Sequence, residues 1–121
     1  ATALQKVSIR SRYGAGNSCL GEAIRIMEDH LDVPLSSPEL AGRLGITVRQ
    51  LQRLFERYIN SSPKRYLMDL RLRRARNLIM QSDQAITEIA MACGFTSTTH
   101  FTKAYRDRFG KTPGSQRAFL N

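Results

Sequence analysis

Apolar residues recur along the chain at intervals of three and four positions, and no segment alternates convincingly as a β-strand would. The clearest apolar stripe, which predicts a first amphipathic helix over residues 20–31, consists of Leu20, Ala23, Ile24, Met27 and Leu31. Comparable stripes predict six further helices: at about 37–44, from 48 through 58, from 63 to about 81, around 86–93, over 97–109, and from 113 onward. The expected fold is therefore all-α, with about seven helices.

Two of these helical segments repeat. Residues 40–47 (Leu-Ala-x-x-x-Gly-Ile-Thr) match residues 89–96 (Ile-Ala-x-x-x-Gly-Phe-Thr) at an offset of 49, and after a one-residue insertion the match resumes at 50 as far as Ser62-Pro63 and Thr112-Pro113. In each copy a short helix ends at glycine, an apolar residue follows, and a Ser or Thr caps a second helix with a polar face. This is the pattern of a helix-turn-helix.

The repeat divides the chain. We expect a linker or tail at residues 1–18, left by a missing N-terminal domain, a first helix-turn-helix subdomain at 19–62, a connector helix at 63–81 and a second subdomain at 82–121. A polar helix face of this kind can enter the major groove of DNA. The alternative interpretation is a pair of ordinary helical hairpins without a DNA-binding role. Two copies of the pattern weaken this alternative more than a single copy would.

Charge adds to this picture by its position. The chain has 19 Lys and Arg against 10 Asp and Glu, a formal net charge of +9. Residues 1–35 hold four of each sign, so the excess lies entirely in residues 36–121, with 15 basic and 6 acidic residues. A region this basic attracts polyanions, and nucleic acid is the leading candidate. A high positive charge can also increase solubility without any binding role.

No catalytic or metal-binding pattern competes with nucleic-acid binding. Cys19 and Cys93 stand alone, His30 and His100 are far apart, and no phosphate-binding or nucleophile motif occurs. We therefore expect no enzyme activity and no cofactor. No apolar run approaches the roughly 20 residues of a membrane span, and no signal peptide is present.

The repeated motifs, together with the residues between them, closely resemble the DNA-binding domain of AraC/XylS transcription regulators. The resemblance covers residues 20–117 and rests on Leu40-Ala41, Gly45, Leu51-x-Arg53-x-Phe55, Ser62-Pro63-x-x-Tyr66, Arg71-Leu72-x-x-Ala75, Ile89-Ala90-x-x-x-Gly94-Phe95 and Phe101-x-Lys103-x-Tyr105-x-x-x-Phe109-Gly110-x-Thr112-Pro113. Residues 7–14 resemble the junction in the subgroup whose N-terminal domain is similar to DJ-1/PfpI or class I glutamine amidotransferases.

The resemblance implies that two recognition helices read adjacent major grooves on one face of DNA, about 34 Å apart. Carried over by position, the base-contacting residues are Arg49, Gln50, Gln52 and Arg53 in the first groove and Thr98, Thr99, Thr102 and Lys103 in the second. Phosphate contacts are expected from Thr47, Ser62, Lys64, Arg65, Ser97, Lys111 and Arg117. Arginine suits guanine and glutamine suits adenine, so we expect sharper base preference in the half-site read by residues 49–53.

Two departures from the family pattern bear on the helices. Ala85 stands where Ser or Thr is common, so the fifth helix is expected to lack a side-chain cap, and Lys103 replaces a commoner arginine. Some connector arginines (Arg71, Arg73, Arg74 and Arg76) are expected to pair with Asp69 or Glu88 or to face solvent rather than touch DNA.

The predicted function is that of a sequence-specific transcription regulator, whose effector and dimerisation domain is absent from this chain. The resemblance implies an activator placed beside RNA polymerase, as most family members are, although the position of the DNA site decides between activation and repression. This function and the missing targeting signal together predict a cytoplasmic, nucleoid-associated bacterial protein. A non-specific basic binder of DNA, RNA or an acidic membrane surface is the alternative. Against RNA and membrane, the aromatic residues occur at core spacing and the polar faces lack large apolar residues. A protein-interaction module is a third possibility, and it would require a large exposed apolar patch. The apolar stripes of this chain are accounted for by packing between the helices.

Overall fold

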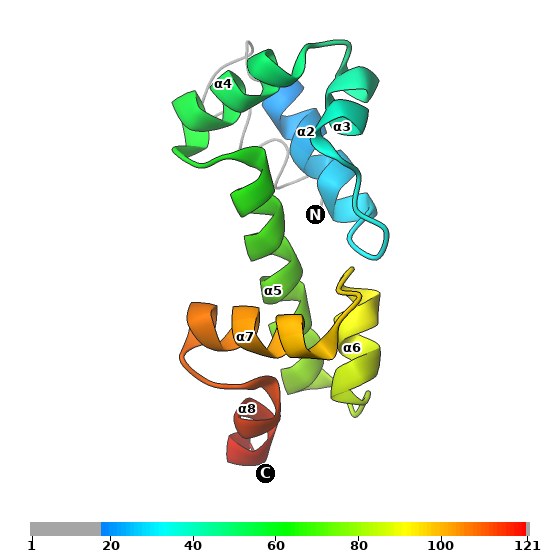
Figure 1. The fold of residues 1–121 in the computed structure, drawn as a ribbon, viewed down its shortest axis with the longest axis vertical. Helices are drawn as coiled ribbons and strands as arrows, with labels where there is room; N and C mark the ends of the chain where they lie inside the picture. Colours follow the sequence, from blue (N-terminus) through cyan, green and yellow to red (C-terminus); the bar gives the residue numbers. More distant parts are fainter. Residues whose placement is uncertain (1–17, 121) are drawn as a thin grey trace. The chain divides into compact units, whose positions relative to one another are not determined.

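A computed structural model describes residues 18–120, with the side chains described as far as residue 118. The junction-like stretch at residues 7–14 and all of the predicted tail except Ser18 lie outside the described residues. The described chain folds into helices α2 (Ser18–Asp29), α3 (Ser37–Leu44), α4 (Val48–Ile59), α5 (Pro63–Gln81), α6 (Ile86–Ala92), α7 (Thr98–Phe109) and α8 (Pro113–Leu120) (Figure 1). The predicted all-α fold is confirmed. Among these helices none is long and apolar enough to cross a membrane.

The chain forms two compact units. Of the described residues, 18–30 and 34–67 belong to the first, and 31–33 and 68–120 to the second. Helix α5 contributes residues 63–67 to the first unit and 68–81 to the second. The predicted boundaries at residues 62 and 81 lie at the two ends of this helix.

The first unit is a three-helix core. Helix α2 packs against α3, and α3 packs against α4. The stripe predicted for the first helix is buried except at Leu31, which is only partly covered. Phe55 of α4 is fully buried and meets the ring of Tyr66 edge-on, with the ring centres 5.7 Å apart. The buried apolar side chains of this unit are Leu20, Ala23, Ile24, Ile26, Met27, Leu40, Ala41, Leu51 and Phe55.

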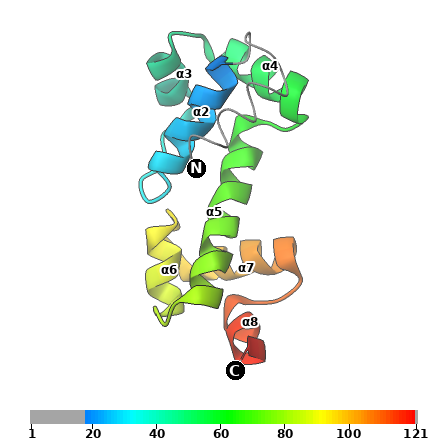
Figure 2. The same cartoon turned by 180° about the vertical axis from the view of Figure 1, so that it is seen from behind.

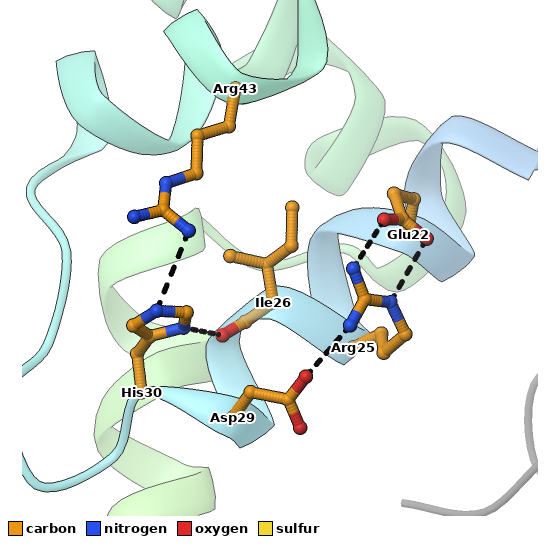
Figure 3. Close-up of polar contacts among 6 residues, drawn as sticks. All are labelled: Glu22, Arg25, Ile26, Asp29, His30 and Arg43. Carbon is orange, nitrogen blue, oxygen red and sulfur yellow. Dashed lines mark hydrogen bonds and ion pairs between the residues drawn. The ribbon is translucent and has the colours of Figure 1, made fainter.

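The polar side of α2 is held by two local clusters (Figure 3). The Arg25 guanidinium lies between the carboxylates of Glu22 and Asp29, at 2.6 and 2.7 Å. At the end of the helix, Nδ1 of His30 lies 2.8 Å from the carbonyl oxygen of Ile26, and its Nε2 lies 3.5 Å from a guanidinium nitrogen of Arg43 on α3. Because a carbonyl can only accept, Nδ1 carries the proton and Nε2 faces Arg43 as the acceptor.

The second unit is built around a chain of aromatic rings. Successive ring centres are 5.0 Å apart between Phe95 and Phe101, 5.8 Å between Phe101 and Tyr105, and 4.7 Å between Tyr105 and Phe109. Tilted pairs at these distances contribute attraction beyond the burial of their surface. Around the rings pack Leu72, Ala75 and Ile79 of α5 and Ile89, Ala90 and Cys93 from α6 and its end. Helix α7 therefore rests on a well-packed base.

The sequence repeat is a repeat of structure. In both copies the glycine after the short helix is left-handed, with φ of 69° at Gly45 and 88° at Gly94. The next residue closes the turn in the same way: the Ile46 amide donates to the Ala41 carbonyl at 3.0 Å, and the Phe95 amide to the Ala90 carbonyl at 2.9 Å. Glycine adopts such φ values without steric cost, because it has no Cβ atom. The turns between α3 and α4 and between α6 and α7 can be followed from behind in Figure 2.

Candidate nucleic-acid interface

The first candidate reading face lies at the start of α4. The Thr47 hydroxyl accepts from the Gln50 amide at 3.0 Å, and the Gln50 side-chain oxygen accepts from the Thr47 amide at 2.9 Å. This reciprocal capping box stabilises the first turn. It also uses Oε1 of Gln50, the atom that a bidentate contact with adenine requires. The sequence predicts this cap correctly. It does not show that the cap occupies the Gln50 atom that a contact with adenine would need.

The other three predicted reading residues of α4 are unconstrained. Arg49, Gln52 and Arg53 are exposed, and their side chains make no hydrogen bond or ion pair with any residue in the range 18–118. Their neighbours Leu51 and Phe55 are fully buried, which anchors the opposite face of the helix. The arrangement offers two guanidinium groups and one primary amide to a ligand from a rigid support.

The second candidate reading face lies on α7. The Ser97 hydroxyl caps the helix by accepting from the His100 amide at 3.2 Å. Thr98, Thr99 and Lys103 are exposed and Thr102 is partly so, whereas Phe101 and Tyr105 are buried on the other side. A shallow hollow of about 400 Å³ runs along this face, and it is lined by Thr98, Thr99, Thr102, Lys103 and Arg106. The structure thus brings the four predicted residues of this face together and adds Arg106.

Arg106 was missed because the resemblance to the family points only to residues up to Lys103. The helical period would have found it: position 106 is four residues after Thr102 and three after Lys103, which places it on the same stripe.

The predicted phosphate-contacting residues occupy helix starts and nearby loops. The hydroxyl of Ser62 accepts from the Arg65 amide at 3.1 Å, which caps α5. Lys64, Arg65 and Lys111 are exposed. A capping hydroxyl still has its own proton to donate, and the first amides of a helix have no partner within it. These groups can therefore meet a phosphate without disturbing the helix that they cap.

Arg117 of α8 is placed differently. Its guanidinium donates to the carbonyl oxygen of Ser82 at 3.0 Å, to that of Ile79 at 3.4 Å and also to that of Gln84. A cation at this position satisfies the Ile79 carbonyl in the last turn of α5 and two carbonyls of the loop that follows it. The phosphate contact predicted for Arg117 stays a prediction, and the structure gives this side chain a role in the fold.

The connector arginines are likewise occupied in several cases. Arg73 pairs with Asp69 at 2.9 Å, as the sequence predicted for part of this set, and Arg108 of α7 reaches the other oxygen of the same carboxylate at 2.6 Å. Arg76 lies over the Phe109 ring, 5.1 Å from its centre. Arg74 is exposed and makes no hydrogen bond or ion pair with the described residues.

Arg71 joins α5 to the turn between α6 and α7. Its Nε donates to the Cys93 carbonyl at 2.8 Å and one Nη to the Gly94 carbonyl at 2.6 Å. Partial burial lowers the pKa of this guanidinium, but arginine starts so high that the charge is kept at neutral pH. The sequence placed Arg71 among residues that pair with acids or face solvent; two backbone carbonyls hold it instead, a contact that only the tertiary structure creates.

The chain has clear relatives. A family described as "Helix-turn-helix domain" matches residues 40–118. The "HTH-type transcriptional regulator ArgR" of Pseudomonas aeruginosa is 39% identical over 113 residues, which are 93% of this chain and 34% of that protein. The "HTH-type transcriptional activator RhaS" of Escherichia fergusonii is 35% identical over 111 residues, 92% of this chain and 40% of that protein.

A solved structure from Chromobacterium violaceum, described as a transcriptional regulator with an AraC-type DNA-binding domain, is 40% identical with a TM-score of 0.82; the match covers 88% of this chain and 95% of that one. The chain belongs to the AraC family. A second similar structure is the DNA-binding domain of AdpA, described as a global transcriptional factor and solved in complex with a target DNA, at 29% identity and a TM-score of 0.78 over 83% of this chain and 90% of that one.

Membership of the AraC family confirms the resemblance stated from the sequence. It also shows that the chain is the helix-turn-helix part of a family whose members are named as transcription regulators. The chain spans about a third of the length of the first curated relatives that it matches. The AraC-type geometry described above is thus one part of what those relatives contain.

Proposed function

We propose that the chain binds double-stranded promoter DNA in a sequence-specific manner, with α4 and α7 as recognition helices that enter two adjacent major grooves. The observation that carries the proposal is the repeated turn. Two short helices end at left-handed glycines with the same closing hydrogen bond, and each precedes a capped helix with an exposed polar face. A recognition helix contacts base edges mainly with the residues near its N-terminus.

The side chains on these two faces differ in how selectively they can form hydrogen bonds with the edges of bases. Arg49 and Arg53 each present a planar fork that matches the O6 and N7 atoms of guanine. Gln52 is the residue for adenine, because its amide is uncommitted, whereas the Oε1 of Gln50 already accepts from the Thr47 amide. On α7, Thr98, Thr99 and Thr102 offer hydroxyl and methyl groups, and Lys103 offers one ammonium. The half-site read by α4 is therefore the more selective of the two.

The phosphate contacts set register and salt dependence rather than sequence choice. Their proposed donors are the cap hydroxyls of Thr47, Ser62 and Ser97 and the side chains of Lys64, Arg65 and Lys111. The charge distribution supports this assignment, since the whole excess of +9 lies in residues 36–121.

For the whole protein we propose a transcription regulator that activates, acts beside RNA polymerase in the bacterial cytoplasm and on the nucleoid, and carries an N-terminal effector or dimerisation domain. Two facts support the proposal: relatives of about three times this length are named as regulators, and the RhaS relatives are named as activators. Activation requires only that the bound chain be placed where it can touch polymerase.

The decisive experiment is selection of bound duplexes from a random pool, followed by titration of the selected duplex and a scrambled one at two salt concentrations. We expect a bipartite motif with centres about one helical turn apart, bound roughly a thousandfold or more tighter than the scramble. Equal affinity for both duplexes with the same steep salt slope would leave only non-specific binding by charge.

Exchange of one half-site at a time then tests the ranking of the two helices. We expect the larger loss of affinity when the half-site read by α4 is scrambled. Equal losses would contradict the assignment of the stronger readers to residues 49–53.

A further inference from the structure

The hollow on α7 contains one cation that the predicted reading face did not include. Three threonines line the hollow with Lys103, and Arg106 completes it one turn further along the helix. Threonine contributes a methyl group as well as a hydroxyl, so the lining has both apolar and polar parts. Such a surface is suited to a flat polar ligand edge that carries a methyl group.

The two cations of the hollow differ in what already binds them. The Lys103 ammonium lies 3.1 Å from the Asp107 carboxylate, whereas the Arg106 side chain makes no hydrogen bond or ion pair with any of residues 18–118. Arg108, two residues later, is tied to Asp69 at 2.6 Å. Among the basic side chains on α7, Arg106 is thus the one whose guanidinium is exposed and makes no hydrogen bond or ion pair with the described residues.

We infer that Arg106 is a further specificity-determining residue, which reads the O6 and N7 atoms of a guanine in the second half-site beside a thymine whose methyl group enters the threonine-lined part of the hollow. The inference rests on the proposed function, because it assigns the chemistry of the second recognition helix. Arginine binds this guanine edge with two parallel hydrogen bonds, and threonine methyls are suitable partners for the thymine C5-methyl group.

A phosphate contact is the competing role for an exposed arginine at this position. The observations favour the base, because Arg106 shares the hollow with three neutral threonines. The one other cation of the lining, Lys103, already faces the Asp107 carboxylate. The two roles differ in experiment: a base contact fixes one position of the motif, whereas a phosphate contact weakens all sequences alike.

The test compares selected motifs and affinities for the wild-type chain, R106A and R106K. We expect the wild-type motif to contain a guanine in the second half-site. Both variants should lose preference at that base pair by about tenfold, since a lysine ammonium keeps the charge but not the fork. The midpoint of urea unfolding should stay unchanged, because Arg106 is exposed and unpaired within the described chain.

Two patterns of affinity in the variants would overturn the inference, in addition to the two motif results given below. One is that R106K keeps the wild-type preference, because a point charge would then suffice. The other is that R106A weakens binding to the selected and scrambled duplexes equally and lowers the salt slope by about one, which is the behaviour of a phosphate contact.

R74A is the matched control. It removes the same charge from an exposed arginine of the same unit, on α5 and outside the hollow, and should leave the preferred bases unchanged. A wild-type chain that selects no motif would overturn the proposed function and this inference with it. A wild-type motif that persists unchanged in R106A would overturn the inference alone.

Discussion

The guanidinium carbon of Arg71 lies 4.2 Å from the centre of the Phe95 ring. Phe95 is 2% exposed and follows the left-handed Gly94, so the arginine covers the residue that plugs the space between α6 and α7. Its two hydrogen bonds to the carbonyls of Cys93 and Gly94 approach the same turn from α5. One side chain thereby fixes the corner from which the second recognition helix starts.

Replacement of Arg71 should therefore destabilise the fold. We expect R71A to lower the free energy of unfolding by about 2–3 kcal/mol, because it removes two charge-assisted hydrogen bonds and leaves half-buried carbonyls without donors. R71K should recover less than half of the loss, since an ammonium cannot both bind two carbonyls and stack on a ring. Urea unfolding measures both values. R74A is the control, and an R71A midpoint equal to that of R74A would contradict the role assigned to Arg71.

Helix α6 starts without a side-chain cap, as the sequence predicted. Ala85 occupies the N-cap position with φ of −61° and ψ of 147°, and its counterpart in the first copy, Ser36, has φ of −68° and ψ of 163° and accepts from the Glu39 amide. Since the backbones are alike, A85S should gain about 1 kcal/mol of stability, and S36A should lose a similar amount. Thermal unfolding compares the pair. A loss in S36A with no gain in A85S would show that the two caps are not equivalent.

Substitution of Gln50 and of Gln52 should have different effects, one on stability and the other on base preference. Q52A is expected to leave the urea midpoint unchanged and to remove a preference for adenine in the first half-site, a discrimination of about 1–3 kcal/mol. Q50A is expected to lower the stability by about 0.5–1 kcal/mol, because it opens the capping box with Thr47. Unfolding curves and selected motifs should be recorded for both variants. The reverse pattern would assign the reading role to Gln50.

Alkaline pH should weaken the second unit. Burial raises the pKa of the Cys93 thiol, against the opposing effect of Arg74 and Arg71, and burial also raises the pKa of Tyr105. The folded chain therefore holds these protons after the unfolded chain has released them, so the stability falls as pH rises above the ordinary thiol pKa of about 8.5. The contribution is fully present below that pH.

Urea midpoints between about pH 7.5 and 10.5 measure this dependence. In C93A the urea midpoint should decline less steeply than in the wild type over the pH range in which the unfolded thiol ionises. The reason is that Cys93 no longer contributes to the difference in bound protons between the folded and the unfolded chain. An identical slope in both proteins would contradict the assignment to Cys93.

Local rules were sufficient for most helix bounds, although the first helix, predicted over residues 20–31, runs from Ser18 to Asp29. Each start or stop that the sequence predicted depends on atoms within four residues: the hydroxyl of Thr47 and the amide of Gln50, the left-handed glycines, and Pro63 in a first turn. The apolar period then identified the buried positions, such as Phe55 and Phe101. The repeat followed from the same signals, since two copies of one local pattern must build two copies of one turn.

The partners of long polar side chains were beyond such rules. A basic run such as residues 71–76 has the same appearance whether an arginine reaches solvent, a carboxylate or a backbone carbonyl. Arg71 and Arg117 bind carbonyls 22 and 35 residues away, at 2.8 and 3.0 Å, and the sequence gives no sign of either contact. Conversely, only the fold shows that Arg106 is left exposed beside three threonines in one hollow. The helices, the two turns and the exposed faces can be predicted from the sequence alone, because they depend on neighbours in the chain. Which cations stabilise the protein and which remain available to DNA follows only from the fold, because that depends on the carbonyls and carboxylates that folding brings within reach.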